Sequence, residues 1–484
     1  MFMGILQINS SRVHRALLKK KSGNLSDLRG KKVPHNKSSP STMESIKNHI
    51  QSFPTIVSHY CRTQSQKKYL DCNLNLSLMY RLYVDSLRER NVDKVPSQSL
   101  YEKVFRREFN LSFKSPRKDT CQTCDRLNIE IKAAEENKDE AMLKTKKLNQ
   151  ELHHRKVQLA RSEINEDVKI SKEGKATVIS FDLQKVMLLP KLTTGVVYYK
   201  RQLSCYNLGI HNFENNVGTM HVWDESTASR GSQEIGSCIL KFINTHDHKD
   251  ILIAWSDSCG GQNRNINIAA LWMYIVQSPT LNIKEVVHKF AEPGHSYLQN
   301  DSDFGDIEKK LKYHPEIYVP TQWHNIISNS RVKKNKFEVV CMEKEDFKSM
   351  DALKQNLVNR KKDSDEQKVE WLKIKQMKFT QDHPGVMEFK YTHNKEIQFY
   401  SVNLNKRLKG RPVNLASLNL SILYPEGRKL SQAKLNDIRS LLQFVPPCHH
   451  QFYNKLQQSE VLEDDIEEEN DNNNEEENEM NNAI

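Results

Sequence analysis

Two aspartates in this chain each follow an apolar run of the kind that forms a buried strand. Asp182 ends the segment Ala176–Phe181, and Asp257 follows the segment Ile251–Trp255. Short apolar runs rich in β-branched residues and bounded by polar ones are typical of core strands. Open α/β sheets bind ligands at the carboxyl ends of their strands. We therefore expect both carboxylates at one edge of a sheet, where their oxygens suit a hard divalent cation.

A third acidic cluster, Asn300–Glu308, opens a segment with a helical pattern. Asp301 and Glu308 are two turns apart on such a helix and therefore face the same side. One of these two is the expected third ligand, with Asp303 as a substitute if the helix begins differently. Three carboxylates can hold two Mg²⁺ or Mn²⁺ ions for phosphoryl transfer, with Asp182 bridging both. The alternative is that each aspartate only caps a loop.

Polar residues beside these acids suit contacts with a phosphodiester. Gln262, Asn263 and Arg264 come directly after the second acid and offer amide and guanidinium donors. Capping of the next helix by Asn263 or Asn265 is the alternative. His295 precedes the third cluster, where it would orient water, contact phosphate or simply bond to the backbone of a turn.

A separate set of residues has the spacing of a zinc site. Cys121 and Cys124 form a C-x-x-C pair, and His153 follows after a charged helical stretch. Tetrahedral zinc takes four sulfur or nitrogen ligands, so a fourth is needed, for which His59 and Cys61 are the candidates. Two free thiols or a redox pair are the alternatives.

The elements between the acids follow a regular order. Two longer antiparallel strands are expected after Asp182, followed by alternating helices and strands that end in the acidic helix. Strands joined by helices are expected to be parallel. The predicted fold class is therefore α/β, with a mixed sheet in the order β-β-β-α-β-α-β-α. The predicted later elements are strands at Val196–Tyr206 and Gly218–Trp223, a helix at Gln233–Ile243, a helix at Asn265–Val276 and a strand at Glu285–Phe290.

This order, with acids at strand one, strand four and the last helix, resembles the RNase H-like core of DDE transposases and integrases. Several motifs are similar to those of a family of transposase-derived animal proteins, and the similarity extends from about Phe53 to Leu456. These motifs are Phe181-Asp182-Leu183-Gln184-Lys185, Tyr199-Lys200-Arg201-Gln202-Leu203, Tyr206-Asn207-Leu208-Gly209-Ile210-His211, Arg230-Gly231-Ser232-Gln233-Glu234-Ile235-Gly236-Ser237-Cys238, Gly260-Gly261-Gln262-Asn263 and Gly294-His295-Ser296.

The resemblance implies a DNA-binding protein with a DDE-type site for phosphodiester cleavage or strand transfer. It leaves two outcomes open: an active metal-dependent transposase or nuclease, and a domesticated, catalytically inactive protein that binds DNA or chromatin. A nuclease acting on RNA or hybrids would share the same core. No small-molecule substrate is expected.

The charge distribution points to a polyanionic partner. The chain has 73 basic and 61 acidic residues in 484 positions, a net charge of +12. Residues 460–484 contain 12 of the acids and no Lys or Arg, so the remaining residues carry 73 basic against 49 acidic side chains, or +24. Such a body is expected to attract a polyanion such as a nucleic acid, and a solvated basic surface is the alternative. We expect a nuclear protein, without a membrane span and with its nine cysteines reduced.

The regions around the predicted core, residues 173–330, complete the domain prediction. Residues 51–125 are expected to be helical and DNA-binding, with Lys103, Arg106 and Arg107 on the polar face of the second of two helices. A helical linker suited to self-association, with a solvated spacer as the alternative, is expected at 126–172. The others are a disordered basic arm at 1–50, an accessory α+β region at 331–456, which includes a turn or minor-groove hook at Lys409–Pro412, and a disordered acidic tail at 457–484.

Overall fold

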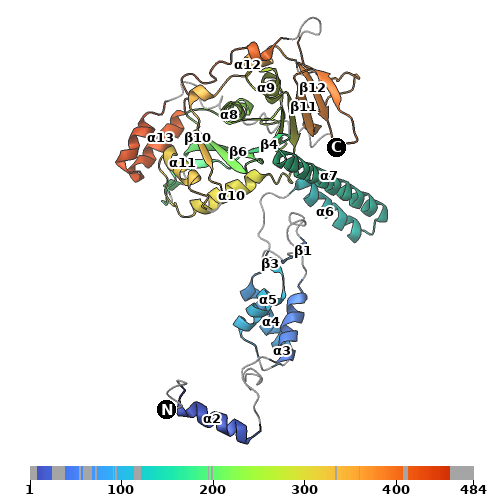
Figure 1. The fold of residues 1–484 in the computed structure, drawn as a ribbon, viewed down its shortest axis with the longest axis vertical. Helices are drawn as coiled ribbons and strands as arrows, with labels where there is room; N and C mark the ends of the chain where they lie inside the picture. Colours follow the sequence, from blue (N-terminus) through green and yellow to red (C-terminus); the bar gives the residue numbers. More distant parts are fainter. Residues whose placement is uncertain are drawn as a thin grey trace. The chain divides into compact units, whose positions relative to one another are not determined.

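The chain divides into two compact units, Met1–Lys118 and Asp119–Ile484, and each is described by itself (Figure 1). The predicted zinc ligands Cys121 and Cys124 therefore belong to the second unit, although the sequence placed them with the N-terminal helices. His59, Cys61, the Lys409–Pro412 turn and the acidic tail beyond residue 457 lie outside the described residues. The computed structural model describes residues 8–23, 39–53, 56–57, 68–70, 74–90, 92, 95–113, 121–194, 196–197, 200–332, 335–358, 360–406 and 413–457.

Three helices of the first unit pack around a small apolar core. The core includes Met79 and Tyr83 from one helix and Tyr101 and Val104 from the next. Asn75 and Ser97 accept hydrogen bonds from the first turns of these two helices, which explains where they begin. The predicted helix pair is confirmed. The elements are α2 (Ser10–Lys21), α3 (Pro40–Gln51), β1 (Ile56–Val57), β2 (Lys68–Leu70), α4 (Leu76–Glu89), α5 (Gln98–Glu108) and β3 (Leu111–Phe113).

The prediction of a disordered arm over residues 1–50 is wrong for α3. Ile46 and Ile50, one turn apart, are fully buried against α4 and α5. Ser39 caps this helix, and Pro40 occupies its first turn, where a missing backbone donor costs nothing. The polar composition before residue 39 concealed a short amphipathic helix. The helix α2 is also formed, although it buries no residue.

The second unit is an α/β structure built on a mixed sheet of ten described strands. Their order is β10-β7-β6-β4-β8-β9-β11-β12-β13, with β5 paired to β6. The strands β7, β6 and β4 are antiparallel, whereas β4, β8 and β9 are parallel, as predicted for strands joined by helices. The strands are β4 (Thr177–Leu183), β5 (Met187–Leu189), β6 (Leu203–Asn212), β7 (Val217–Asp224), β8 (Ile251–Ser256), β9 (Glu285–Phe290), β10 (Glu338–Cys341), β11 (Gln376–Thr380), β12 (Val386–Lys390) and β13 (Tyr400–Asn403).

Helices cover both faces of the sheet because its central strands are apolar on both sides. On one face, Ile179 and Phe181 of β4 pack with α8 and α9 in the largest core cluster. The intervening residues point the opposite way, so Val178 packs with Ile164 of α7. The helices of the second unit are α6 (Gln122–Glu136), α7 (Glu140–Lys172), α8 (Ser232–Thr245), α9 (Ile266–Gln277), α10 (Gln299–Leu311), α11 (Pro320–Ser328), α12 (Asp351–Lys354), α13 (Gln432–Leu441) and α14 (His450–Asn454).

The predicted linker is a helical hairpin whose second helix covers part of the sheet. The helices α6 and α7 lie side by side, and the turn between them includes Lys138 with a positive φ of 56° (Figure 1). Lys289 of β9 is buried beneath α7, where its ammonium lies 2.6 Å from Glu163 and 2.8 Å from Asp167. The indole nitrogen of Trp255 also donates to Asp167, at 2.8 Å. This segment is therefore part of the core unit.

The C-terminal region does not form the separate accessory fold that the sequence predicted. Its strands extend the central sheet at both edges, because β10 pairs with β7 and β11 pairs with β9. The second strand of the core begins later than predicted, at Leu203.

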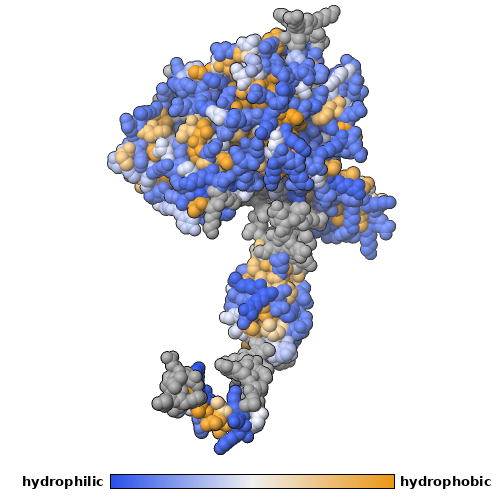
Figure 2. Space-filling view, viewed as in Figure 1, coloured by the Kyte–Doolittle hydropathy of each residue, from blue (hydrophilic) through white to orange (hydrophobic). Residues whose placement is uncertain are grey.

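The visible surface of the second unit is mainly hydrophilic, which agrees with the low hydrophobic content of 37% (Figure 2). Among the described residues, no helix combines the length and the apolar character that a membrane crossing requires. The seven cysteines within the described ranges are in the thiol form and not in disulfides.

Candidate metal centres

The strands β4 and β8 bring Asp182 and Asp257 to the same edge of the sheet. Their parallel register pairs Ser180 with Trp255. Asp182 and Asp257 each come two residues later in the chain. Neighbouring strands lie about 4.8 Å apart, so this register places the carboxylates side by side. Because alternate residues share a face, both belong to the face covered by α7 and α10.

Asp182 is half-buried, and two other carboxylates lie near it. Burial is the main cause that raises its pKa, to about 7, and the carboxylates of Asp257 and Asp301 raise it further. A hydrogen bond of 2.8 Å from the backbone N–H of Leu183 opposes this rise. Asp257 and Asp301 therefore lie close enough to Asp182 to act on its charge.

The third member of this acidic group is Asp301, and Glu308 is not supported in that role. Asp301 lies in the first turn of α10, and its charge acts on Asp182. Glu308 faces the same side but lies two turns further, about 10 Å along the helix axis. It is not among the charges that raise the pKa of Asp182. Asp303, considered as a substitute, points away from this group into the core.

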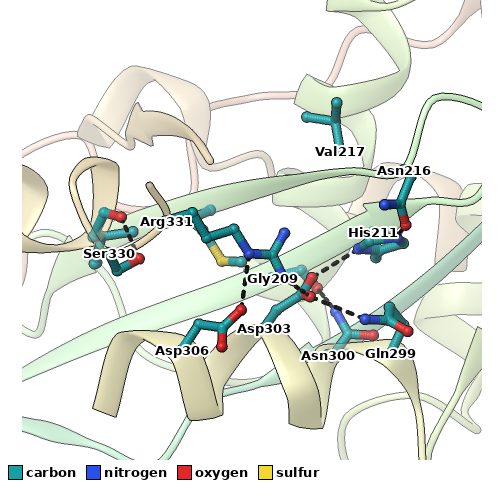
Figure 3. Close-up of polar contacts among 12 residues, drawn as sticks. Gly209, His211, Asn216, Val217, Gln299, Asn300, Asp303, Asp306, Ser330 and Arg331 are labelled. Carbon is teal, nitrogen blue, oxygen red and sulfur yellow. Dashed lines mark hydrogen bonds and ion pairs between the residues drawn. The ribbon is translucent and has the colours of Figure 1, made fainter. Parts of the chain in front are cut away.

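Asp303 belongs to a buried ionic network that fixes α10 on the sheet (Figure 3). One of its oxygens lies 2.7 Å from His211 Nδ1, and the other accepts a hydrogen bond of 2.5 Å from Arg331. The guanidinium of Arg331 also binds Asp306, at 3.1 Å. These partners leave Asp303 no capacity to serve as the third ligand, since its carboxylate is fully buried and paired.

A second set of contacts brings the start of α10 close to β6 (Figure 3). The side-chain amide of Asn300 donates to the carbonyl of Gly209, at 2.7 Å. A Cβ atom at Gly209 would come within 2.9 Å of the Phe304 ring, so glycine permits this close approach. The buried face of α10 thus consists of Asn300, Asp303, Phe304 and Ile307, which leaves Asp301 exposed at the edge of the sheet.

The loop after β8 is held by a chain of buried donors that the sequence did not reveal. Trp272 donates its indole proton to His288 Nδ1 at 3.2 Å, so the proton on Nε2 faces Ser256 Oγ at 2.9 Å. Ser256 in turn donates to the backbone carbonyl of Asp257, at 2.8 Å. Burial lowers the pKa of His288 to about 3, so the imidazole remains neutral. This chain fixes the peptide that carries Asp257.

Asn263 and Arg264 face inward, which corrects the prediction that they contact a phosphodiester. Asn263 is 3% exposed and donates its amide to the carboxylate of Asp257. Arg264 is 6% exposed and donates to the carbonyls of Ser258 and Ile374, at 2.9 and 3.0 Å. Both residues therefore shape the Asp257 loop from within. Gln262 is half-buried in the same loop, and Asn265 caps α9 as the alternative interpretation held.

Four side chains from three segments form a group that can hold a metal ion such as zinc. Cys121, Cys124, His153 and His295 each offer one ligand atom, and these atoms all lie within 4.8 Å of one another. The contacts are 3.3 Å from Cys121 Sγ to His153 Nε2, 3.4 Å from Cys124 Sγ to His295 Nε2 and 3.1 Å between the two Nε2 atoms. His295, predicted to act near the acids, supplies the fourth position.

The protonation states of this group suit a cation. Burial lowers the pKa of His295 to about 4 and also lowers that of His153, so both imidazoles are neutral with a lone pair available. Burial and the charge of Cys121 raise the pKa of Cys124 to about 12. A dication would offset that rise, because metal binding requires the thiolate.

Within the described ranges, this group is the one set of three or more Cys, His, Asp or Glu residues whose ligand atoms all lie within 4.8 Å of one another. Asp182, Asp257 and Asp301 are more widely spread. In a two-metal site, ligands that bind different ions are separated by the distance between the ions, about 4 Å.

The basic residues predicted for DNA contact in the first unit are accessible. Lys103, Arg106 and Arg107 are exposed on α5, opposite its buried residues. Arg106 has an ion pair with Glu102, at 3.8 Å, which is weak at such exposure.

Comparison of the chain with protein-family models and with curated proteins gave no match. The functional argument therefore depends on the geometry of the sites described above.

Proposed function

We propose that this protein binds DNA and that Asp182, Asp257 and Asp301 hold two Mg²⁺ or Mn²⁺ ions for phosphodiester cleavage or strand transfer. The observation that carries the proposal is the environment of Asp182, whose pKa is raised by burial and further by the charges of Asp257 and Asp301. A bound cation would stabilise the charged form of a half-buried carboxyl that has two like charges nearby. A cation site is therefore the role that best accounts for the arrangement of the three acids.

The fold supports the same proposal. The core follows the order β-β-β-α-β-α-β-α with parallel later strands, apart from the short β5, and the acids lie at the first strand, the fourth strand and the last helix. This order supports the proposal that the core is RNase H-like, as the resemblance to transposase-derived proteins implies. Bound ions would activate the attacking oxygen and stabilise the leaving oxygen of an in-line displacement.

The protein's own residues would orient the carboxylates. Asn263 holds Asp257 through its side-chain amide, and the Trp272–His288–Ser256 chain fixes the backbone of Asp257. The buried network of Asp303 and Arg331 sets the position of α10 and hence of Asp301. Since the net charge is +24 outside residues 460–484, DNA is the expected partner and the nucleus the expected location.

A nicking assay on supercoiled plasmid with Mn²⁺ tests the proposal. We expect the wild-type protein to nick the plasmid and Asp182→Asn, Asp257→Asn and Asp301→Asn each to reduce the rate at least about 100-fold, because each removes an ion ligand. Glu308→Gln is the matched control and should retain the wild-type rate.

Equal nicking by the wild type and Asp182→Asn would contradict the catalytic proposal. If the wild type binds DNA without nicking it, the second function that the sequence allowed, a noncatalytic DNA- or chromatin-binding protein, replaces it.

A further inference from the structure

The Cys/His group has the chemistry and geometry of a closed zinc centre. Two thiols and two imidazoles are ligands that zinc prefers, whereas Mg²⁺ and Ca²⁺ take oxygen. A tetrahedral zinc ion has bonds of about 2.3 Å to sulfur and about 2.0 Å to nitrogen. It therefore separates its ligand atoms by roughly 3.3 to 3.8 Å. The observed separations of 3.1, 3.3 and 3.4 Å lie close to that range. Four protein ligands leave no open position, which is typical of a structural ion.

We propose that Cys121, Cys124, His153 and His295 bind one structural zinc ion that clamps the α6–α7 hairpin to the loop between β9 and α10. The first two ligands lie at the start of α6, the third lies on α7, and the fourth lies in the loop. His295 is 171 positions from Cys124 and 142 from His153 in the sequence, so the ion would cross-link segments that are distant along the chain.

The loop is shaped for close contact with the hairpin. Gly294 has a positive φ of 70°, and a Cβ atom there would lie 2.7 Å from the Cα of Cys121. Only glycine fits both the conformation and the space. The backbone N–H of His295 donates to the carbonyl of Glu292, at 2.9 Å, which closes the turn that presents the imidazole. Arg161 of α7 lies over the ring of Tyr297, 5.0 Å from its centroid, and adds a second contact.

The clamp has a consequence for α10. Helix α10 begins at Gln299, four residues after His295, and Asp301 lies in its first turn. A zinc ion on His295 would hold the entry to this helix from one side, while the contact of Asn300 with Gly209 holds it from the other. The functional importance of this contact for Asp301 rests on the proposed cation site, whereas the zinc centre itself does not depend on that site.

The metal content of the full-length chain tests the centre directly. The protein purified without chelators should contain about one zinc ion per chain, as measured by inductively coupled plasma mass spectrometry. Replacement of zinc by Co²⁺ should give the visible absorption of a tetrahedral site with thiolate ligands. Both measurements use the wild-type protein, so they do not depend on a variant that folds. Zinc far below one ion per chain after supplementation, or an octahedral cobalt spectrum, would overturn the proposal.

Matched variants identify the ligands. His295→Ala and Cys124→Ser should each weaken zinc affinity at least about 100-fold in competition with a chelating dye, since second-shell changes alone cost about 10- to 100-fold. Gly294→Ala should weaken zinc affinity at least about tenfold, because the added Cβ would displace the loop from Cys121. Cys448→Ser, at an exposed position elsewhere, is the control and should leave affinity unchanged. His154 is not part of the group but contacts Cys124 Sγ, with its Nε2 at 3.8 Å, so His154→Ala should weaken zinc affinity less than His295→Ala does. Loss of zinc in His154→Ala with retention in His295→Ala would refute the ligand set.

Hydrogen exchange separates the clamp from the acidic site. Removal of zinc should increase amide exchange in residues 292–301 at least about tenfold and leave α8 unchanged as an internal control. If removal of zinc changed amide exchange equally in residues 292–301 and in α8, the proposed clamp would be overturned. An Asp301→Asn protein that keeps its zinc but lacks nicking activity would support both proposals. A wild-type protein that binds zinc without nicking DNA would overturn the proposed enzymatic function alone.

Discussion

Asp182 carries most of the functional argument at the scale of single residues. Its carboxyl lies near the end of a core strand, where burial, and in addition the charges of Asp257 and Asp301, raise its pKa to about 7. Among the described residues Asp182 has a backbone donor but no ion pair, so its charged form loses solvation without a compensating cation, which destabilises the metal-free fold. Such a cost at a strand end is common at functional sites.

This cost predicts a pH-dependent gain in stability for Asp182→Asn. The ordinary pKa of 3.8 is raised in the fold, so the folded state holds the proton more tightly. Wild-type stability therefore falls as the pH rises from about 4 to about 7 and remains low above that value. In EDTA, the variant should be more stable than the wild type at pH 8, by about 2 kcal/mol or more, since each pKa unit corresponds to about 1.4 kcal/mol.

The difference in stability between Asp182→Asn and the wild type should shrink at pH 5, where Asp182 of the folded wild type is already protonated. Chemical denaturation at both pH values measures it, with Glu308→Gln as the control. A variant that is no more stable than the wild type at pH 8 would show that Asp182 is not held among like charges.

Arg264 shows how a residue type can mislead. A guanidinium directly after a glycine loop and an acid suits phosphate binding, and its identity alone gives no sign that it is buried. In the structure its donors are used by two backbone carbonyls, so its role is to shape the loop around Asp257.

Among the elements, the α6–α7 hairpin differs most from its predicted role. The sequence from 126 to 172 is rich in charged helix formers, which favours an exposed linker. Two of those charges, Glu163 and Asp167, are instead buried partners of Lys289. The hairpin therefore depends on the sheet beneath it.

We expect Lys289→Met to destabilise the protein by about 3 to 5 kcal/mol, because it removes the buried ammonium that pairs with both Glu163 and Asp167. The triple variant Lys289→Met, Glu163→Gln and Asp167→Asn should recover part of that loss. The free energy of unfolding from urea denaturation measures both changes. Lys284→Met, which removes a solvent-exposed ion pair with Asp250, is the control and should change stability little. A similar small effect of Lys289→Met would mean that α7 does not cover the sheet as described.

At the scale of the whole molecule, the positive charge outside the acidic tail is the property most relevant to a partner. In the first unit, Lys103, Arg106 and Arg107 are exposed on one helix, opposite its apolar core. Each basic residue that neutralises a phosphate releases counterions, so its loss reduces the salt dependence of binding.

We expect the triple alanine variant of Lys103, Arg106 and Arg107 to weaken DNA binding by the full chain at least about tenfold and to reduce the salt slope by about 2 to 3. Fluorescence anisotropy with a labelled duplex across a salt series measures both quantities. The control is the triple alanine variant of Lys361, Lys368 and Lys373, which removes the same charge from exposed positions in the second unit. Equal losses in the two variants would assign the effect to net charge alone and contradict a DNA-binding role for α5.

The sequence by itself determined the local elements of the core. The strands ending in Asp182 and Asp257, the strand Glu285–Phe290 and the acidic helix were all predictable, because apolar periodicity and terminal capping act between residues near one another in the chain. The pair Cys121 and Cys124 was also recognisable, because its two residues are close together in the chain. The segment over α3 was missed because its amphipathic pattern is short and set in a polar context.

Only the tertiary structure decided which distant residues meet. The joining of His295 to the cysteine pair, the choice of Asp301 over Glu308, the burial of Asp303 and Arg264, and the extension of the sheet by the C-terminal strands all depend on packing. A residue's type specifies the bonds it can make, but its partner is selected by the register of the sheet and by the helix face that is buried against it. Those choices depend on contacts between segments far apart in the chain, by 171 positions for Cys124 and His295 and by 110 for Arg264 and Ile374, which no local pattern records.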